Sequence, residues 1–130
     1  MIDHIGIPVS DYPRSKAFYE QVLAAIGVSL LMEVTPEQTG DGTWAAGFGR
    51  DQKPGFWIGN DPRGVAAHTH VAFTVDSRAQ VDAFHAAGIA AGGSDNGAPG
   101  LRPHYHPDYY GGFIIAPDGH NIEAVCHRPE

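Results

Sequence analysis

The chain has 130 residues, and its 15 Asp and Glu against eight Lys and Arg give a formal net charge of −7. A chain of this length forms one domain with a proper hydrophobic core. The acidic balance leaves no basic stripe, which excludes nucleic acid and anionic membrane surfaces as partners and favours a small-molecule substrate. Cys126, the single cysteine, has no disulfide partner, and the sequence shows neither a signal-peptide pattern nor an apolar run of membrane-spanning length. We therefore expect a cytoplasmic protein.

The first half of the chain predicts one strand, one helix and three further strands. The strands are expected over 3–9, 28–34, 43–50 and 55–60, and the helix over 13–26. Pro13 suits the first turn of this helix and Gly27 follows its end. The polar residues 35–42 are expected to form a loop, and 51–54 a turn.

The second half repeats this order. A strand over 68–75 precedes a helix that begins after Ser77, which has a capping-box pattern, and ends at Gly88. A weaker strand follows within 90–102, and two final strands over 112–116 and 120–126 are joined by a turn at 117–119. The predicted domain therefore has module one at 1–60, a linker at 61–67 and module two at 68–130.

The two modules match each other residue by residue. Segment 4–9 matches segment 70–75, and the same shift pairs Trp57 with Glu123. Such duplications decide the fold class and are sought first. Because side chains alternate along a strand, each module has one bulky aliphatic face and one face of small or polar residues. We predict an α+β fold in which two βαβββ modules form a cup-shaped open barrel sheet with the helices on its outer face.

Three segments carry a resemblance to a known family. They are Asp3-His4-Ile5-Gly6, His70-Val71-Ala72-Phe73 and Pro117-Asp118-Gly119-His120-Asn121-Ile122-Glu123. In these segments the chain resembles the vicinal oxygen chelate superfamily, which includes glyoxalase I, extradiol dioxygenases and bleomycin-resistance proteins. The resemblance covers nearly the whole chain and implies no single reaction.

The resemblance implies that His4, His70 and Glu123 bind a divalent metal ion, with Fe, Mn, Zn and Ni as the candidates. Two imidazoles and a carboxylate form a facial triad that leaves positions open for a bidentate oxygen substrate. The glyoxalase relatives commonly place a fourth ligand, a Glu, where this chain has Trp57. Tryptophan does not ligate metal, so this departure argues against glyoxalase I activity.

Each ligand assignment has a structural alternative. His4 and His70 could simply satisfy backbone groups at strand starts. Glu123 could lie on an exposed edge strand, although a carboxylate inside a strand is costly to bury unless a cation offsets the cost.

The aromatic segment 102–110 predicts a lid over the metal. Tyr109 and His106 join Glu123 as candidate catalytic groups, because phenol and imidazole transfer protons near neutral pH. The expected substrate-binding residues are Trp57, His68, Arg102, Tyr105 and Tyr110. The alternatives are a loop that packs across the cup or against a dimer partner, an exposed His68, and a Trp57 that only lines the wall.

We expect a divalent-metal-dependent enzyme acting on a small substrate chelated through vicinal oxygens, either a lyase of the lactoylglutathione lyase type, an isomerase or a ring-cleaving dioxygenase. The alternative is a non-catalytic small-molecule-binding resistance protein of the bleomycin-resistance type. The resemblance also implies a homodimer, in which the modules pair within one chain or are exchanged between two chains.

Overall fold

The computed structural model describes residues 1–130, and it confirms an α+β fold made of two similar modules. Module one contains β1 (Ile5–Pro8), α1 (Tyr12–Ala24), β2 (Ser29–Val34), α2 (Pro36–Thr39), β3 (Ala45–Arg50) and β4 (Lys53–Gly59). Module two contains β5 (His70–Thr74), α3 (Arg78–Ala90), β6 (Ser94–Leu101), β7 (Tyr110–Ile115) and β8 (Asn121–Cys126).

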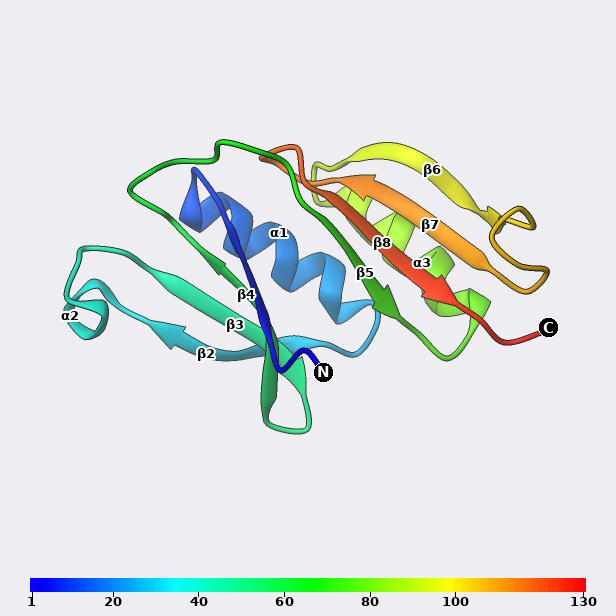
Figure 1. Cartoon of the computed structure of the whole chain (residues 1–130), viewed down its shortest axis with the longest axis horizontal. Coiled ribbons are helices and arrows are strands. Elements are labelled where there is room, and N and C mark those ends of the chain that lie inside the picture. The colour runs from blue at the N-terminus through cyan, green and yellow to red at the C-terminus, as the bar shows by residue number, and fades with distance from the viewer.

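Each module folds its four strands into a separate sheet. The strand orders are β1-β4-β3-β2 and β5-β8-β7-β6, and in each sheet the first strand pairs in parallel with the last strand of its module. Helices α1 and α3 lie on the same side of the molecule, behind the strands in Figure 1. The other side of each sheet, called here its open face, carries no helix, and the sheets do not close into a barrel.

The buried core forms where the aliphatic strand faces meet the helices. In module one, Tyr19 of α1 packs its ring against Phe48 and Phe56, and Ile58 is buried beside them. The alternation along β4 therefore leaves Trp57 on the open face, as the sequence predicts. None of the helices has the length and apolar character needed to cross a membrane.

Some element boundaries differ from the sequence expectation. The expected loop 35–42 contains the short helix α2, because Thr35 and Gln38 form a capping box at its start. The second long helix runs past Gly88, which lies inside it. A Cβ at Gly88 would lie 2.7 Å from Cγ1 of Ile114, so glycine is needed here for close packing and does not mark the helix end.

A buried histidine joins the two modules. The Thr69 N–H donates to Nδ1 of His120 at 2.9 Å, so the ring carries its hydrogen on Nε2, which donates to the Pro8 carbonyl at 2.7 Å. The ring is fully buried. The end of β1 is thereby tied to the residues just before β5 and β8.

Candidate functional site

Glu123 lies at the middle of β8 on the open face of module two. Its neighbours across the sheet are Ala72 on β5 and Phe113 on β7. Only 2% of the residue is exposed. The Tyr109 hydroxyl donates to its Oε1, and His70 Nε2 lies 3.1 Å from its Oε2. The carboxylate is therefore buried, as a ligand carboxylate would be, and not set on an exposed edge.

The hydrogen bonds of His70 determine which ring nitrogen faces the carboxylate. Its Nδ1 lies 2.9 Å from the carbonyl oxygen of Asn121, which can only accept, so Nδ1 carries the hydrogen. In the neutral ring, Nε2 then directs a lone pair toward a Glu123 oxygen. Two facing acceptors repel each other unless a proton or a cation lies between them, so this pair fits a shared metal ion.

The Tyr109 side chain lies against the Glu123 carboxylate, next to the His70 and Glu123 pair. Its ring packs against those of Tyr105, His106 and His127, with ring centroids 4.8, 5.5 and 5.3 Å away. Burial and the Glu123 carboxylate raise the pKa of the Tyr109 phenol well above its ordinary value. The phenol therefore stays protonated near neutral pH and can act as a proton donor at Oε1.

His106 packs edge-on against the Tyr109 ring and makes no hydrogen bond with Glu123. Its Nδ1 accepts the Asp108 N–H at 3.1 Å, and its Nε2 lies 2.8 Å from Nδ1 of His127. Both ring nitrogens thus have partners within the chain. In this conformation the structure does not bring His106 to the carboxylate.

The other expected substrate-binding residues of module two are dispersed. The Arg102 guanidinium lies 5.4 Å from the ring centre of Phe113, on the open face, and Tyr105 is 60% exposed beside Tyr109. Tyr110 points to the opposite side of the sheet, where its hydroxyl donates to Asp82 of α3 at 2.7 Å. His68 is exposed and lies against the turn at Gly119. The structure therefore does not bring Tyr110 or His68 to Glu123.

His4 is not part of this site within one chain. It precedes β1, its side chain is 60% exposed, and its Nδ1 lies 2.6 Å from Asp3. Strands β1 and β5 run in opposite directions in Figure 1, so His4, which precedes β1, and His70, which begins β5, do not lie at the same end of the two strands. No group of three or more His, Cys, Asp or Glu side chains in the chain could hold a metal ion. One chain thus supplies two of the three expected ligands to a common place.

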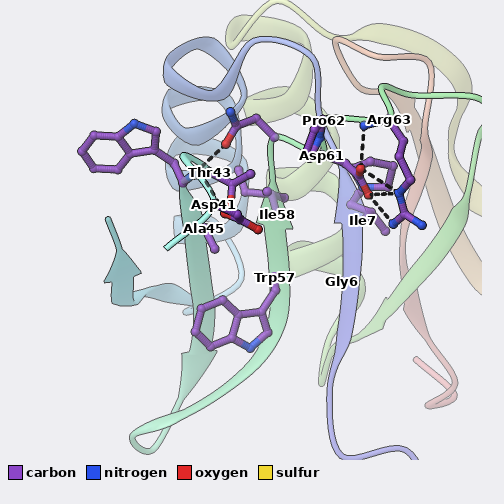
Figure 2. Close-up of a pocket in the computed structure, with 14 residues that line it drawn as sticks. Gly6, Ile7, Asp41, Thr43, Ala45, Trp57, Ile58, Asp61, Pro62 and Arg63 are labelled. Atoms are coloured by element: carbon purple, nitrogen blue, oxygen red, sulfur yellow. Dashed lines mark hydrogen bonds and ion pairs between the residues drawn. The ribbon is translucent and has the colours of Figure 1, made fainter. Parts of the chain in front are cut away.

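Module one has a hollow of about 710 Å³ on its open face (Figure 2). Trp57 lines it and covers Gly47, where an added Cβ would lie 2.8 Å from the indole. The indole N–H donates to the Pro54 carbonyl at 3.0 Å, which fixes the ring. Since one ring face covers Gly47, the other is free to stack on a planar ligand.

The rim of the hollow carries charge. Asp61 and Arg63 form an ion pair at 2.6 Å, and hydrogen bonds from Arg63 lower the pKa of Asp61 to about 2. The Thr43 hydroxyl and N–H lower the pKa of Asp41. All three side chains are therefore ionised at neutral pH, and the rim has a net negative charge.

Sequence reasoning missed three residues near Glu123. Phe113 stacks on the His70 ring, with centroids 6.3 Å apart, and His127 packs on Tyr109. Asn121 precedes Glu123 by two residues and so shares its face. The two-residue period of a strand was the signal that could have identified Asn121.

The comparisons with known proteins agree with the two-module fold. The model of the Glyoxalase/Bleomycin resistance protein/Dioxygenase superfamily matches residues 1–124. The chain belongs to this superfamily. A glyoxalase/bleomycin resistance protein from Albidiferax ferrireducens T118 is 30% identical with a TM-score of 0.74, and the match covers 95% of this chain and 96% of that one. No curated protein matches the chain.

More distant solved structures of the superfamily share the fold. A family enzyme from Burkholderia phytofirmans PsJN is 20% identical with a TM-score of 0.68, and 98% of each chain is covered. Glyoxalase I from Zea mays is also 20% identical with a TM-score of 0.68, and the match covers 96% of this chain but only 45% of the maize chain. This chain therefore spans about half the length of the maize enzyme.

Proposed function

We propose that this superfamily member is a divalent-metal-dependent enzyme that acts on a small substrate chelated through vicinal oxygens. The observation that carries this proposal is the close approach of His70 to the buried carboxylate of Glu123. The Nε2 lone pair of His70 faces Oε2 of Glu123 at 3.1 Å, and this carboxylate is 98% removed from solvent without any Lys or Arg ion pair. A divalent cation between the two atoms would satisfy both.

The third ligand comes from a second copy of the chain in this proposal. His4 precedes β1 and His70 begins β5, and these two strands run in opposite directions. Both are edge strands with one side unpaired. A homodimer with exchanged modules would place His4 of one copy at the His70 and Glu123 of the other. Each dimer would then have two sites.

The chain's own residues then have distinct roles. Glu123 would bind the ion through Oε2, while Tyr109 holds Oε1 and keeps the carboxylate in a single orientation. The bound ion would act as a Lewis acid toward the chelated oxygens of the substrate. Tyr109 would donate or recover a proton at the edge of the substrate, and the aromatic segment 102–110 would restrict the entry of water. Lyase, isomerase and ring-cleaving dioxygenase chemistry all fit these roles.

Elemental analysis of untagged protein purified without chelator tests the proposal. Wild type should contain close to one equivalent of Fe, Mn, Zn or Ni, and Glu123→Ala should lose most of it. Glu20→Ala is the matched control, because Glu20 lies on α1 with a partly exposed side chain and only a 4.0 Å contact to Lys16. If wild type holds no metal and takes up no zinc, manganese or ferrous iron, the enzyme proposal is wrong.

Co-expression of two variants that each lack one metal ligand tests the exchange of modules. His4→Ala and Glu123→Ala should each bind little metal alone. Co-expressed, they should form mixed dimers in which one of the two sites has a full ligand set, so metal content should recover to about one ion per mixed dimer. No recovery in a confirmed mixed dimer would contradict a site shared between chains.

The hollow beside Trp57 favours a second candidate, a small-molecule-binding resistance protein without catalysis. A fixed indole with one free face binds planar ligands without a metal. Under this alternative, metal-free protein would bind a planar aromatic compound with quenching of indole fluorescence. Trp57→Leu would abolish that binding, and Glu123→Ala would leave it unchanged.

A further inference from the structure

A second hollow lies where the two modules meet, and we call it the junction cleft. Its walls come from β1, β3 and β4 of module one, from Ile26 and Val28 between α1 and β2, and from β5 of module two. Its volume is about 380 Å³, which is within the range of small-ligand pockets. It shares no lining residue with the hollow beside Trp57, and neither His70 nor Glu123 lines it. The junction cleft is therefore distinct from both sites described above.

Most of the junction cleft is apolar. Ile26, Phe48 and Phe56 of module one are buried, and they line the cleft together with the half-buried Val71 and Phe73 of β5. The rings of Phe56 and Phe73 pack edge to face across the junction, with their centroids 5.2 Å apart. Because Val71 and Phe73 keep part of their apolar surface in contact with solvent, a ligand with an apolar body that covers this surface would bind favourably.

Two cationic side chains line the same cleft, and only one of them is neutralised. Nζ of Lys53 lies 2.7 Å from Oδ2 of Asp3. Arg50 donates a hydrogen bond to the Ile26 carbonyl at 2.5 Å, just past the end of α1, and forms no ion pair. This carbonyl orients the guanidinium without cancelling its charge, and the remaining N–H donors can bind a carboxylate. A positive charge beside an apolar wall is complementary to an amphipathic anion.

We propose that the junction cleft binds a small monocarboxylic acid with an apolar chain, of the medium-chain fatty acid class. Arg50 binds the carboxylate, and the apolar residues of both modules cover the chain. The site needs no metal ion and uses none of the residues of the proposed enzyme site. The two proposals can therefore fail independently of each other.

Octanoate is the probe, and titrations of metal-free protein followed by NMR locate it. It should leave the indole signal of Trp57 in place and shift the methyl signals of Ile5, Ile26, Val28 and Val71. Acetate, which has the charge without the chain, should cause no shift at the same concentrations. From butanoate to octanoate, each added methylene should tighten binding about three- to fourfold as it enters the cleft. The neutral 1-octanol should bind about five to ten times more weakly than octanoate, because it forms no charged hydrogen bond with Arg50.

Substitutions of Arg50 test the role of the guanidinium. Arg50→Gln should weaken octanoate binding by about the same five- to tenfold and leave the affinity for 1-octanol unchanged. Arg50→Lys keeps the charge and should retain most of the octanoate affinity. Arg14→Gln is the matched control for net charge, because Arg14 is exposed on α1, forms no ion pair and does not line the cleft. Urea denaturation of each variant establishes that it is folded.

Four outcomes would overturn the proposal. They are no binding of octanoate, equal octanoate affinity in wild type and Arg50→Gln, an equal loss of affinity in Arg14→Gln, and octanoate shifts confined to the signals of Trp57 and the residues around Glu123. The last would place the acid in one of the sites described above. A protein that binds octanoate through Arg50 but takes up no metal would retain this inference and reject the metal enzyme.

Discussion

The phenolic hydrogen of Tyr109 is donated to Oε1 of Glu123, a carboxylate on the open face that is almost completely buried. This bond leaves Oε2 as the oxygen that faces His70. The two oxygens of the Glu123 carboxylate thus have different neighbours: Oε1 accepts the hydrogen of the Tyr109 phenol, and Oε2 faces the His70 imidazole. Under the proposed function, the carboxylate would bind an ion through Oε2 and exchange a proton at Oε1 without rotating.

Tyr109→Phe should destabilise the protein, because it leaves a buried charged acceptor without its donor. Hydrogen bonds to charged groups contribute about 1.5–3 kcal/mol, so we expect a loss of about 2 kcal/mol in the free energy of unfolding. Urea denaturation at neutral pH measures it. Tyr105→Phe is the control, because that residue is 60% exposed and should change stability little. Equal losses in both variants would contradict the assigned bond.

The raised pKa of Tyr109 predicts a specific dependence on pH. A group whose pKa is higher in the folded state contributes stability that is complete below its unfolded pKa, about 10, and is lost as the pH rises through the folded value. Wild type should therefore lose stability relative to Tyr109→Phe only above about pH 10. Glu123→Gln removes the charge that helps to raise this pKa, so the phenol should titrate at lower pH, as followed by ultraviolet absorbance. An unchanged titration would show that burial alone sets the pKa.

The close contact of Gly47 with Trp57 predicts non-additive substitutions. Gly47→Ala puts a Cβ within 2.8 Å of the indole and should cost about 1–3 kcal/mol through overpacking. Trp57→Leu removes the ring, so the same Gly47→Ala change should cost much less in that background. The measurement is a double-mutant cycle in urea. Additive losses would mean that the indole does not lie on Gly47.

The fold could be predicted from the sequence because its main signals are local. The match between segments 4–9 and 70–75 reveals the duplication, and strand alternation places Trp57 and Glu123 on the open faces. The capping box at Ser77 correctly marks the start of α3. Gly88 was misread as a helix end because only the packed structure shows that Ile114 needs the space.

The candidate site was harder to predict because it depends on contacts between distant segments. The family resemblance implied Glu123 and His70 as ligands, and the structure brings these two side chains together. The resemblance gave no means of placing His4, because the relative direction of β1 and β5 is a property of how the modules pack. Adjacent residues of a strand point to opposite sides of the sheet. Gly111 lies on the same side as Glu123, so its neighbour Tyr110 points to the other side, toward α3.

The buried ring of His120 supplies the last prediction, which concerns the junction of the modules. His120→Phe preserves the ring shape but leaves the Thr69 N–H and the Pro8 carbonyl without partners. An unsatisfied buried group costs about 1–3 kcal/mol, so the variant should lose about 2–5 kcal/mol in the free energy of unfolding. Ser10→Ala is the matched control at the same junction. It removes only the exposed bond from the Ser10 hydroxyl to Asp118, and we expect a loss of about 1 kcal/mol or less. Because His120 positions Thr69, and His70 follows it, metal uptake should also weaken in His120→Phe and not in Ser10→Ala. A His120→Phe variant as stable as wild type would show that the ring only fills space.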